Sequence, residues 1–153
     1  MPSTQPIVDS GEQPLQVNTR FGRQAIDPAS VIRFPAGLAG FENLHEYKLF
    51  HEEGHNSLFY LQSLEDPEVQ FPVINPLTCQ VAYEFVLSDD EVAELELDAP
   101  EDVAVLVTLA RTEDDDHGIH ANFMGPILIN TRRRVAVQKS LNKVTGRVVI
   151  RAE

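Results

Sequence analysis

The sequence predicts an all-β fold with one short helix, arranged as a small barrel or sandwich. Short runs of β-branched and aromatic residues recur along the chain, and each run is bounded by Gly, Pro, Asn or Asp. Two runs end at an acid or amide before proline, Asp66-Pro67 and Asn75-Pro76, which restricts the backbone and removes an amide donor. Only the stretch around Ser88 carries the signals of a helix. The 153 residues are enough for one domain with one core.

The N-terminal region divides into an arm and the start of the fold. Residues 1–13 contain Pro, Ser, Gln and Gly with few large apolar groups, so we expect a disordered arm. Residues 14–153 are expected to form a single domain. Its first strand is predicted at residues 15–19, where Leu15, Val17 and Thr19 alternate with polar residues.

Further apolar runs predict the remaining strands. The run at 103–110 is continuous and β-branched, which is typical of a strand covered on both faces. The predicted ranges are residues 31–34, 47–50, 58–61, 71–74, 80–87, 103–110, 127–129 and 148–150.

The helix is predicted to begin at Ser88. Ser88 and Glu91 have the spacing of a capping box, in which each side chain bonds to the other residue's amide. Asp89 and Asp90 lie at the positive end of the helix dipole. The helix must be short because Pro100 follows soon after.

Charge is distributed unevenly along the chain, whose formal net charge is -12. Residues 34–130, the acidic body, hold twenty acidic residues against only Lys48 and Arg111, and the remaining residues are net basic. Phosphate binding requires clustered Lys and Arg, so we expect no direct nucleic-acid partner. A basic protein is a better-suited partner, although a solvated surface explains any single acidic cluster equally well.

The sequence gives no sign of export or membrane insertion. Its apolar runs are too short to span a bilayer, and its first residues do not follow the pattern of a secretory signal. A lone Cys79 forms no internal disulfide, so a reducing compartment is compatible. We expect a cytoplasmic protein with no membrane partner.

Catalytic signals are weak. His117 and His120 beside Asp114, Asp115 and Asp116 allow the alternative of a metal-dependent enzyme, but an acidic loop between strands explains the same residues. No serine lies in a nucleophile elbow and no glycine loop matches a phosphate site. We therefore expect a non-enzymatic protein with no metal and no cofactor.

Several sequence blocks stand in an order and spacing that match a known family. The clearest are Leu61-Gln62-Ser63-Leu64-Glu65-Asp66-Pro67 and Phe71-Pro72-Val73-Ile74-Asn75-Pro76. The others are Asn18 to Gly22, Ile32 to Pro35, Gly37 to Glu42, Ala121-Asn122, Pro126 to Asn130, and Arg134 with Gln138. In these blocks the chain resembles the FliW family of flagellar assembly factors. The resemblance covers roughly residues 15 to 151 and implies a compact antiparallel β-barrel.

The resemblance also implies two protein partners. Proteins of this family bind flagellin in the cytoplasm, and they bind CsrA, a small basic RNA-binding protein that represses translation of messages including flagellin's. The factor then prevents this repression until accumulating flagellin occupies it. A flagellin-specific chaperone without a translational role is the alternative. Ligands coupled in this way must affect each other's binding reciprocally.

Two sets of residues are candidates for these contacts. Acids at motif or helix edges are assigned to CsrA: Glu65, Asp66, Glu68, Asp89, Asp90 and Glu94. Apolar residues in or beside the matched blocks are assigned to flagellin: Phe41, Phe71, Val73 and Phe123. A turn role for Glu65 and Asp66, and core packing for the aromatic residues, are the competing interpretations. Arg132-Arg133-Arg134 is predicted to be a hairpin turn, with a contact to flagellin acids or RNA as the alternative.

Overall fold

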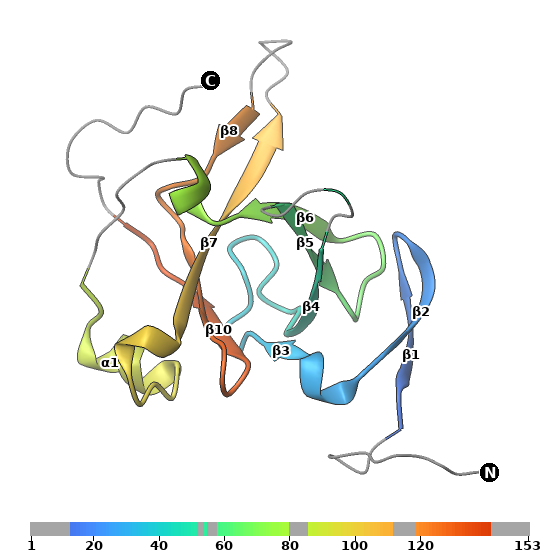
Figure 1. Ribbon diagram of the computed structural model, residues 1–153, viewed down its shortest axis with the longest axis horizontal. Helices are drawn as coiled ribbons and strands as arrows, with labels where there is room; N and C mark the ends of the chain where they lie inside the picture. The colour runs from blue at the N-terminus through green and yellow to red at the C-terminus, as the bar shows by residue number, and fades with distance from the viewer. Residues whose placement is uncertain (1–12, 52–53, 55–57, 80–85, 112–118, 142–153) are drawn as a thin grey trace.

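The computed structural model describes residues 13–51, 54, 58–79, 86–111 and 119–141 (Figure 1). Ten strands lie in these ranges: β1 Leu15–Thr19, β2 Gly22–Ile26, β3 Ile32–Arg33, β4 Glu46–His51, β5 Leu58–Ser63, β6 Gln70–Ile74, β7 Val103–Arg111, β8 Ile119–Ala121, β9 Ile127–Asn130 and β10 Val135–Gln138. The helical elements are α1 Asp89–Glu94 and the short 3₁₀ turns η1 Pro28–Ser30, η2 Pro76–Cys79 and η3 Pro100–Asp102.

Seven of the strands close into a barrel, as the resemblance implied. The order is β6-β5-β4-β3-β10-β9-β7, and pairing of β6 with β7 completes the ring. The pairs are antiparallel except for β3 with β10, which is parallel. Closure removes the unpaired edges that an open sheet of these strands would expose. β8 extends the far end of β7, and β1 and β2 form a separate hairpin beside the barrel (Figure 1).

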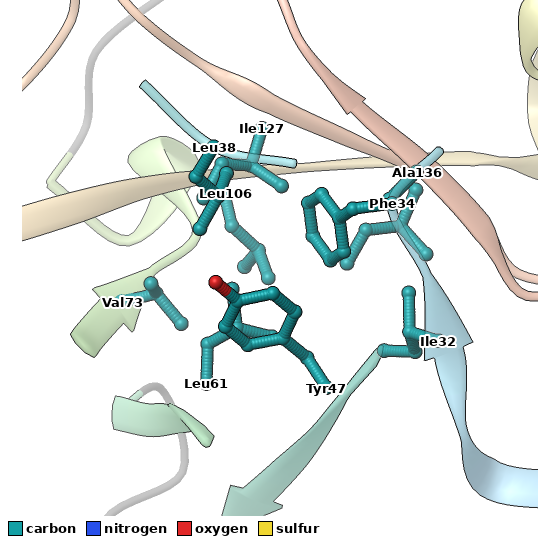
Figure 2. Packing of buried hydrophobic residues seen from close by; sticks show 10 residues of the cluster. Ile32, Phe34, Leu38, Tyr47, Leu61, Val73, Leu106, Ile127 and Ala136 are labelled. Atoms are coloured by element: carbon teal, nitrogen blue, oxygen red, sulfur yellow. The ribbon is translucent and has the colours of Figure 1, made fainter. Parts of the chain in front are cut away.

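The core fills the barrel and includes part of a loop. Figure 2 shows Tyr47, Leu61, Val73 and Ile127 converging from different strands. Phe34 and Leu38, from the connection between β3 and β4, complete the cluster at 0% and 4% exposure. This connection therefore closes the barrel interior with its own side chains, and Phe41 and Leu44 of the same loop pack against the cluster.

The outer face of β9 is covered as well. All four residues of Ile127–Asn130 are buried, although only Ile127 and Ile129 belong to the core cluster. Asn130 donates from Nδ2 to the carbonyl oxygens of Leu95 and Glu96 at 2.8 and 3.0 Å. The segment at the end of α1 thus lies against β9, and Leu95 is fully buried there.

Most of the predicted elements are present. The capping box is confirmed, since Ser88 Oγ accepts from the Glu91 amide and Glu91 Oε1 accepts from the Ser88 amide. The strand predicted at 31–34 is shorter, at Ile32–Arg33. Strands β2, β8 and β10 were not predicted from the sequence. Of the strand predicted at 80–87, residues 86 and 87 are not in a strand and the others lie outside the described residues, as do the strand at 148–150 and most of the expected arm.

The prediction of a turn at Arg132-Arg133-Arg134 is confirmed. These residues connect β9 to β10, and Arg134 closes the turn with a φ of 57°.

No helix within the described ranges is long and apolar enough to cross a membrane.

Candidate partner-binding site

Gln62 organises the loop between β5 and β6, residues 63–69, which we call the Glu65 loop. The Gln62 side chain is fully buried at the end of β5. Its Nε2 donates to the carbonyl oxygens of Ser63, Pro67 and Val69 at 2.9, 3.2 and 3.3 Å. One buried amide therefore holds both ends of the loop, which is how buried backbone carbonyls avoid the cost of lacking partners.

The same side chain connects the Glu65 loop to the β1–β2 hairpin. Gln62 Oε1 accepts from the backbone N of Arg20, in the hairpin turn, at 3.2 Å. Next to it, Phe21 packs edge-on against Phe50 and Tyr60, with ring centroids 5.5 and 5.7 Å away. The hairpin is thus attached through its turn to the outer face of β4 and β5.

The carboxylates of the Glu65 loop accept hydrogen bonds from the chain itself. Glu65 Oε1 accepts from the backbone N of His45 at 2.5 Å and of Glu46 at 3.1 Å. Asp66 Oδ1 accepts from the Glu68 amide at 3.0 Å, which is the turn role weighed for Asp66 in the sequence analysis. Both side chains therefore have a structural use, whether or not a partner also contacts them.

The acids of α1 are used differently. Asp89, Asp90 and Glu94 are exposed, and no cation of the described chain lies within ion-pair distance of any of them. Asp89 and Asp90 lie in the first turn, where the helix dipole favours negative charge. Their carboxylates therefore remain available to a partner in solution.

Glu91, in the same helix, is paired. Lys139 Nζ donates to both Glu91 carboxylate oxygens at 2.8 Å. The Glu91 side chain is only 20% exposed and the Lys139 side chain only 14%. Burial opposes ionisation of Glu91, but the hydrogen bonds from Lys139 and the Ser88 amide, with the Lys139 charge, leave its pKa below the ordinary value. This pair fixes α1 against the end of β10.

Two arginines of the turn, Arg132 and Arg133, form ion pairs with acids of the segment after α1. Arg133 lies 3.2 Å from Asp98 and 3.8 Å from Glu96, and Arg132 lies 3.9 Å from Asp102. These exposed pairs contribute little stability individually. They reduce the positive charge that the turn could offer to RNA or to acidic residues of a partner.

The four candidate flagellin residues differ in accessibility. Val73 is fully buried in the core and Phe123 is 8% exposed, so neither offers a surface as the molecule stands. Phe41 and Phe71 are half-buried and pack edge-on with centroids 5.2 Å apart, against the margin of the core. Of the four, only Phe41 and Phe71 can contact a partner without rearrangement.

A hollow of about 380 Å³ opens beside the β3–β4 loop. It is lined by residues 36–39 and Glu42 of that loop, by Asn122, Met124 and Gly125 before β9, and by residues 138–140 at the end of β10. Gln138 connects the first two walls, since its Oε1 accepts from the Ala39 amide and its Nε2 donates to the Gly125 carbonyl, both at 2.9 Å. The walls are therefore held in place without a ligand.

Two glycines allow close contacts around the hollow, one within the β3–β4 loop and one beside Gln138. Gly37 has a φ of 71°, and a Cβ there would come within 2.7 Å of the Phe41 carbonyl oxygen. A Cβ on Gly125 would come within 2.9 Å of Gln138 Nε2. A larger residue at Gly37 would clash with rigid backbone, whereas one at Gly125 would disturb the Gln138 bridge.

The metal alternative receives no support from the described ranges. No group of three or more His, Cys, Asp and Glu residues there could hold a metal ion. His120 lies exposed on β8, while His117 and the three aspartates before it lie outside the described residues.

Comparison with known proteins identifies the family. The sequence profile of the family described as FliW protein matches residues 16–151. The chain belongs to the FliW family. It is 39% identical over 136 residues to the flagellar assembly factor FliW of Azoarcus sp. (strain BH72), covering 86% of this chain and 93% of that relative. It is 33% identical over 128 residues to the flagellar assembly factor FliW 1 of Desulfotalea psychrophila (strain LSv54 / DSM 12343), covering 83% and 91%.

A solved FliW structure has the same fold. The crystal structure of the flagellar assembly factor FliW aligns with a TM-score of 0.76 at 28% identity, covering 85% of this chain and 91% of that one. Blocks that carry the FliW resemblance gather at the two places described above. Ser63 to Pro67 form much of the Glu65 loop, and residues of the Gly37 to Glu42 block, Asn122 and Gln138 line the hollow.

No role was predicted from the sequence for Gln62, Gln138 or Glu42. A glutamine at the end of an apolar run was the available signal, because a long amide side chain there can reach several backbone groups. The partners of that amide come from distant parts of the chain, so their identity was not readable.

Proposed function

We propose that this chain is a flagellar assembly factor that works by binding proteins in the cytoplasm and not by catalysis. Its partners are flagellin and CsrA, and binding of CsrA prevents repression of messages including flagellin's. Membership of the FliW family supports the flagellar role. The observation that carries the binding mechanism is the exposed acidic set on α1, Asp89, Asp90 and Glu94, which has no cation partner within the described ranges.

The CsrA surface is proposed to combine α1 with the Glu65 loop. Asp89, Asp90 and Glu94 offer unpaired charge, whereas Glu65, Asp66 and Glu68 lie on a loop whose shape Gln62 fixes. Charges presented on ordered elements steer a basic partner and set its register.

The flagellin surface is proposed to centre on Phe41 and Phe71. The terminal segments of flagellin are amphipathic helices in outline, and such a helix needs an apolar surface. The Phe41 and Phe71 rings are half-buried at the margin of the core. Val73 and Phe123 are buried, so a contact from either would need a rearrangement.

Titration calorimetry with CsrA and flagellin, separately and together, tests this function. We expect each to bind alone and each to weaken binding of the other, by the same factor. Binding of flagellin with no heat from CsrA would leave a flagellin-specific chaperone. If neither partner binds, the proposal fails, and a stoichiometric metal with loss of activity on changing His117 or His120 would favour the enzyme alternative.

A further inference from the structure

The hollow beside the β3–β4 loop is a candidate recognition pocket because its walls are fixed. Besides the Gln138 bridge, the Lys139 amide donates to the Pro126 carbonyl and the Leu141 amide to the Met124 carbonyl, both at 2.8 Å. Its volume of about 380 Å³ lies at the small end of the range for binding sites. A pocket that needs no rearrangement loses little affinity to ordering.

The hollow has one carboxylate among its lining residues, that of Glu42. The Glu42 carboxylate accepts from the Gly40 amide at 3.0 Å, and backbone hydrogen bonds from Gly40 and from its own amide keep its pKa below the ordinary value. Lys139 is the only cation among the lining residues, and Glu91 holds it at 2.8 Å. Within the described ranges, no cation lies within ion-pair distance of Glu42.

The rest of the lining suits an aliphatic chain. Among the lining residues Leu38 is buried, Ala36 and Ala39 are exposed, and Met124 is 40% exposed. Methionine adapts its shape to irregular ligands, and the stem of a long cationic side chain packs well on such a surface.

We propose that this hollow receives an arginine side chain from the basic protein partner, with its guanidinium on the Glu42 carboxylate and its stem on Met124. This rests on the proposed function for the identity of the partner, but the chemistry of the hollow stands by itself. Arginine fits better than lysine because its planar fork can donate two parallel hydrogen bonds to a carboxylate. The negative charge disfavours phosphate or carboxylate ligands, and a single carboxylate does not make a metal site.

The direct test uses the full chain and N-acetyl-arginine amide as the probe. Amide resonances of residues 37–42, 124 and 125 are expected to shift in a saturable way. Glu42→Gln should abolish the shifts, because it removes the charge while leaving an oxygen to accept from the Gly40 amide. Glu101→Gln is the matched control, since Glu101 is an exposed acid before the start of β7, where that strand pairs with the opposite end of β9. Its spectrum should shift as the unchanged protein's does.

Two results would overturn the assignment. One is the absence of shifts at the hollow, and the other is equal shifts with N-acetyl-citrulline amide, the neutral analogue. N-acetyl-lysine amide should bind more weakly than the arginine probe, and equal binding would contradict the fork geometry.

Binding of CsrA then tests the link to the partner. Glu42→Gln is expected to weaken CsrA binding about tenfold, the size of one charge-assisted hydrogen bond, while Glu101→Gln changes it little. If CsrA binds both variants like the unchanged protein, the hollow does not serve that partner. If CsrA fails to bind the unchanged protein but the arginine probe shifts the hollow, the proposed function fails and the pocket stands.

Discussion

The Glu65 loop and the hollow are both built around a glutamine, yet Gln62 lies inside the protein and Gln138 lies nearer its surface. Gln62 is fully buried, and the carboxylates of Glu65 and Asp66 accept hydrogen bonds from the chain's own amides. Gln138 is half-buried, and Glu42, which lines the same hollow, is exposed and accepts a hydrogen bond from the Gly40 amide. An acidic residue in a family motif is therefore not by itself a sign of a partner contact.

The contrast separates stability from recognition. Removing the glutamine that holds a loop from inside should cost folding free energy, whereas changing an acid that faces solvent should affect binding first.

The largest effect is expected for Gln62→Ala. It leaves the carbonyls of Ser63, Pro67 and Val69 without their amide donor, so the free energy of unfolding should fall by about 3 kcal/mol. Gln138→Ala is the comparison, with an expected loss of about 1 kcal/mol, because its partners lie at an open surface. Urea unfolding measures both. Equal losses would remove the distinction between the two regions.

Lys139→Met tests the contact that joins α1 to the end of β10. An ion pair as shielded as this one should contribute about 1–2 kcal/mol, between the values for exposed and buried pairs. Because folding lowers the Glu91 pKa, this stabilisation is present above its unfolded value, near 4.5, and is lost as pH falls through the folded pKa. The stability difference between the two proteins should therefore shrink in acid. The double variant Lys139→Met with Glu91→Gln should lose no stability to protonation of Glu91 in acid. If the stability difference between Lys139→Met and the unchanged protein stays constant down to low pH, the assignment is refuted.

Tyr47→Phe should raise stability, by about 1 kcal/mol, because the Tyr47 hydroxyl is buried with no hydrogen-bond partner among the described residues. Burial, with a smaller contribution from the Glu65 charge, raises the Tyr47 pKa to about 12. Stability should therefore fall as pH rises from 10 toward 12, since the unfolded chain ionises first, and this fall should be smaller in the variant.

Glu65→Gln provides a second test of the environment of the Tyr47 hydroxyl. It should lower the Tyr47 pKa, which a spectroscopic tyrosine titration can follow in a chain with three Tyr and no Trp. No change in that titration would mean that the Glu65 charge does not reach the core.

The smallest effects are expected for acid-to-amide changes on the binding surface. Asp89→Asn with Asp90→Asn should weaken CsrA binding by about fivefold at low salt, as expected for two exposed charges. Glu65→Gln with Asp66→Asn should weaken it less, since those carboxylates already contact backbone amides. Calorimetry at two salt concentrations measures both pairs. A stronger effect at the Glu65 loop would reverse the assignment of the main contact.

The sequence predicted features that depend on neighbouring residues. Ser88 and Glu91 are three apart, so their capping box follows from spacing alone. The Asp66 turn and the arginine turn are equally local. The strands at 58–61, 71–74 and 127–129 were found because their apolar runs are distinct, whereas β2, with residues such as Gln24 and Ala25, has no such run.

Contacts between distant residues were not predictable. Gln138 meets Ala39 across 99 positions, Lys139 meets Glu91 across 48, and Gln62 meets Arg20 across 42. Nothing in the local sequence of Gln62 or Gln138 indicates which carbonyl or amide its side chain will reach.

The sequence by itself determined the β-rich class, the single capped helix, the turns and the acidic character of the chain, because short-range backbone preferences and composition decide these. Tertiary structure decided which acids serve the protein's own amides, which remain free, and that a hollow exists. The reason is physical: barrel closure and strand register bring distant segments together, and only then does each side chain acquire its neighbours, its burial and its charge environment.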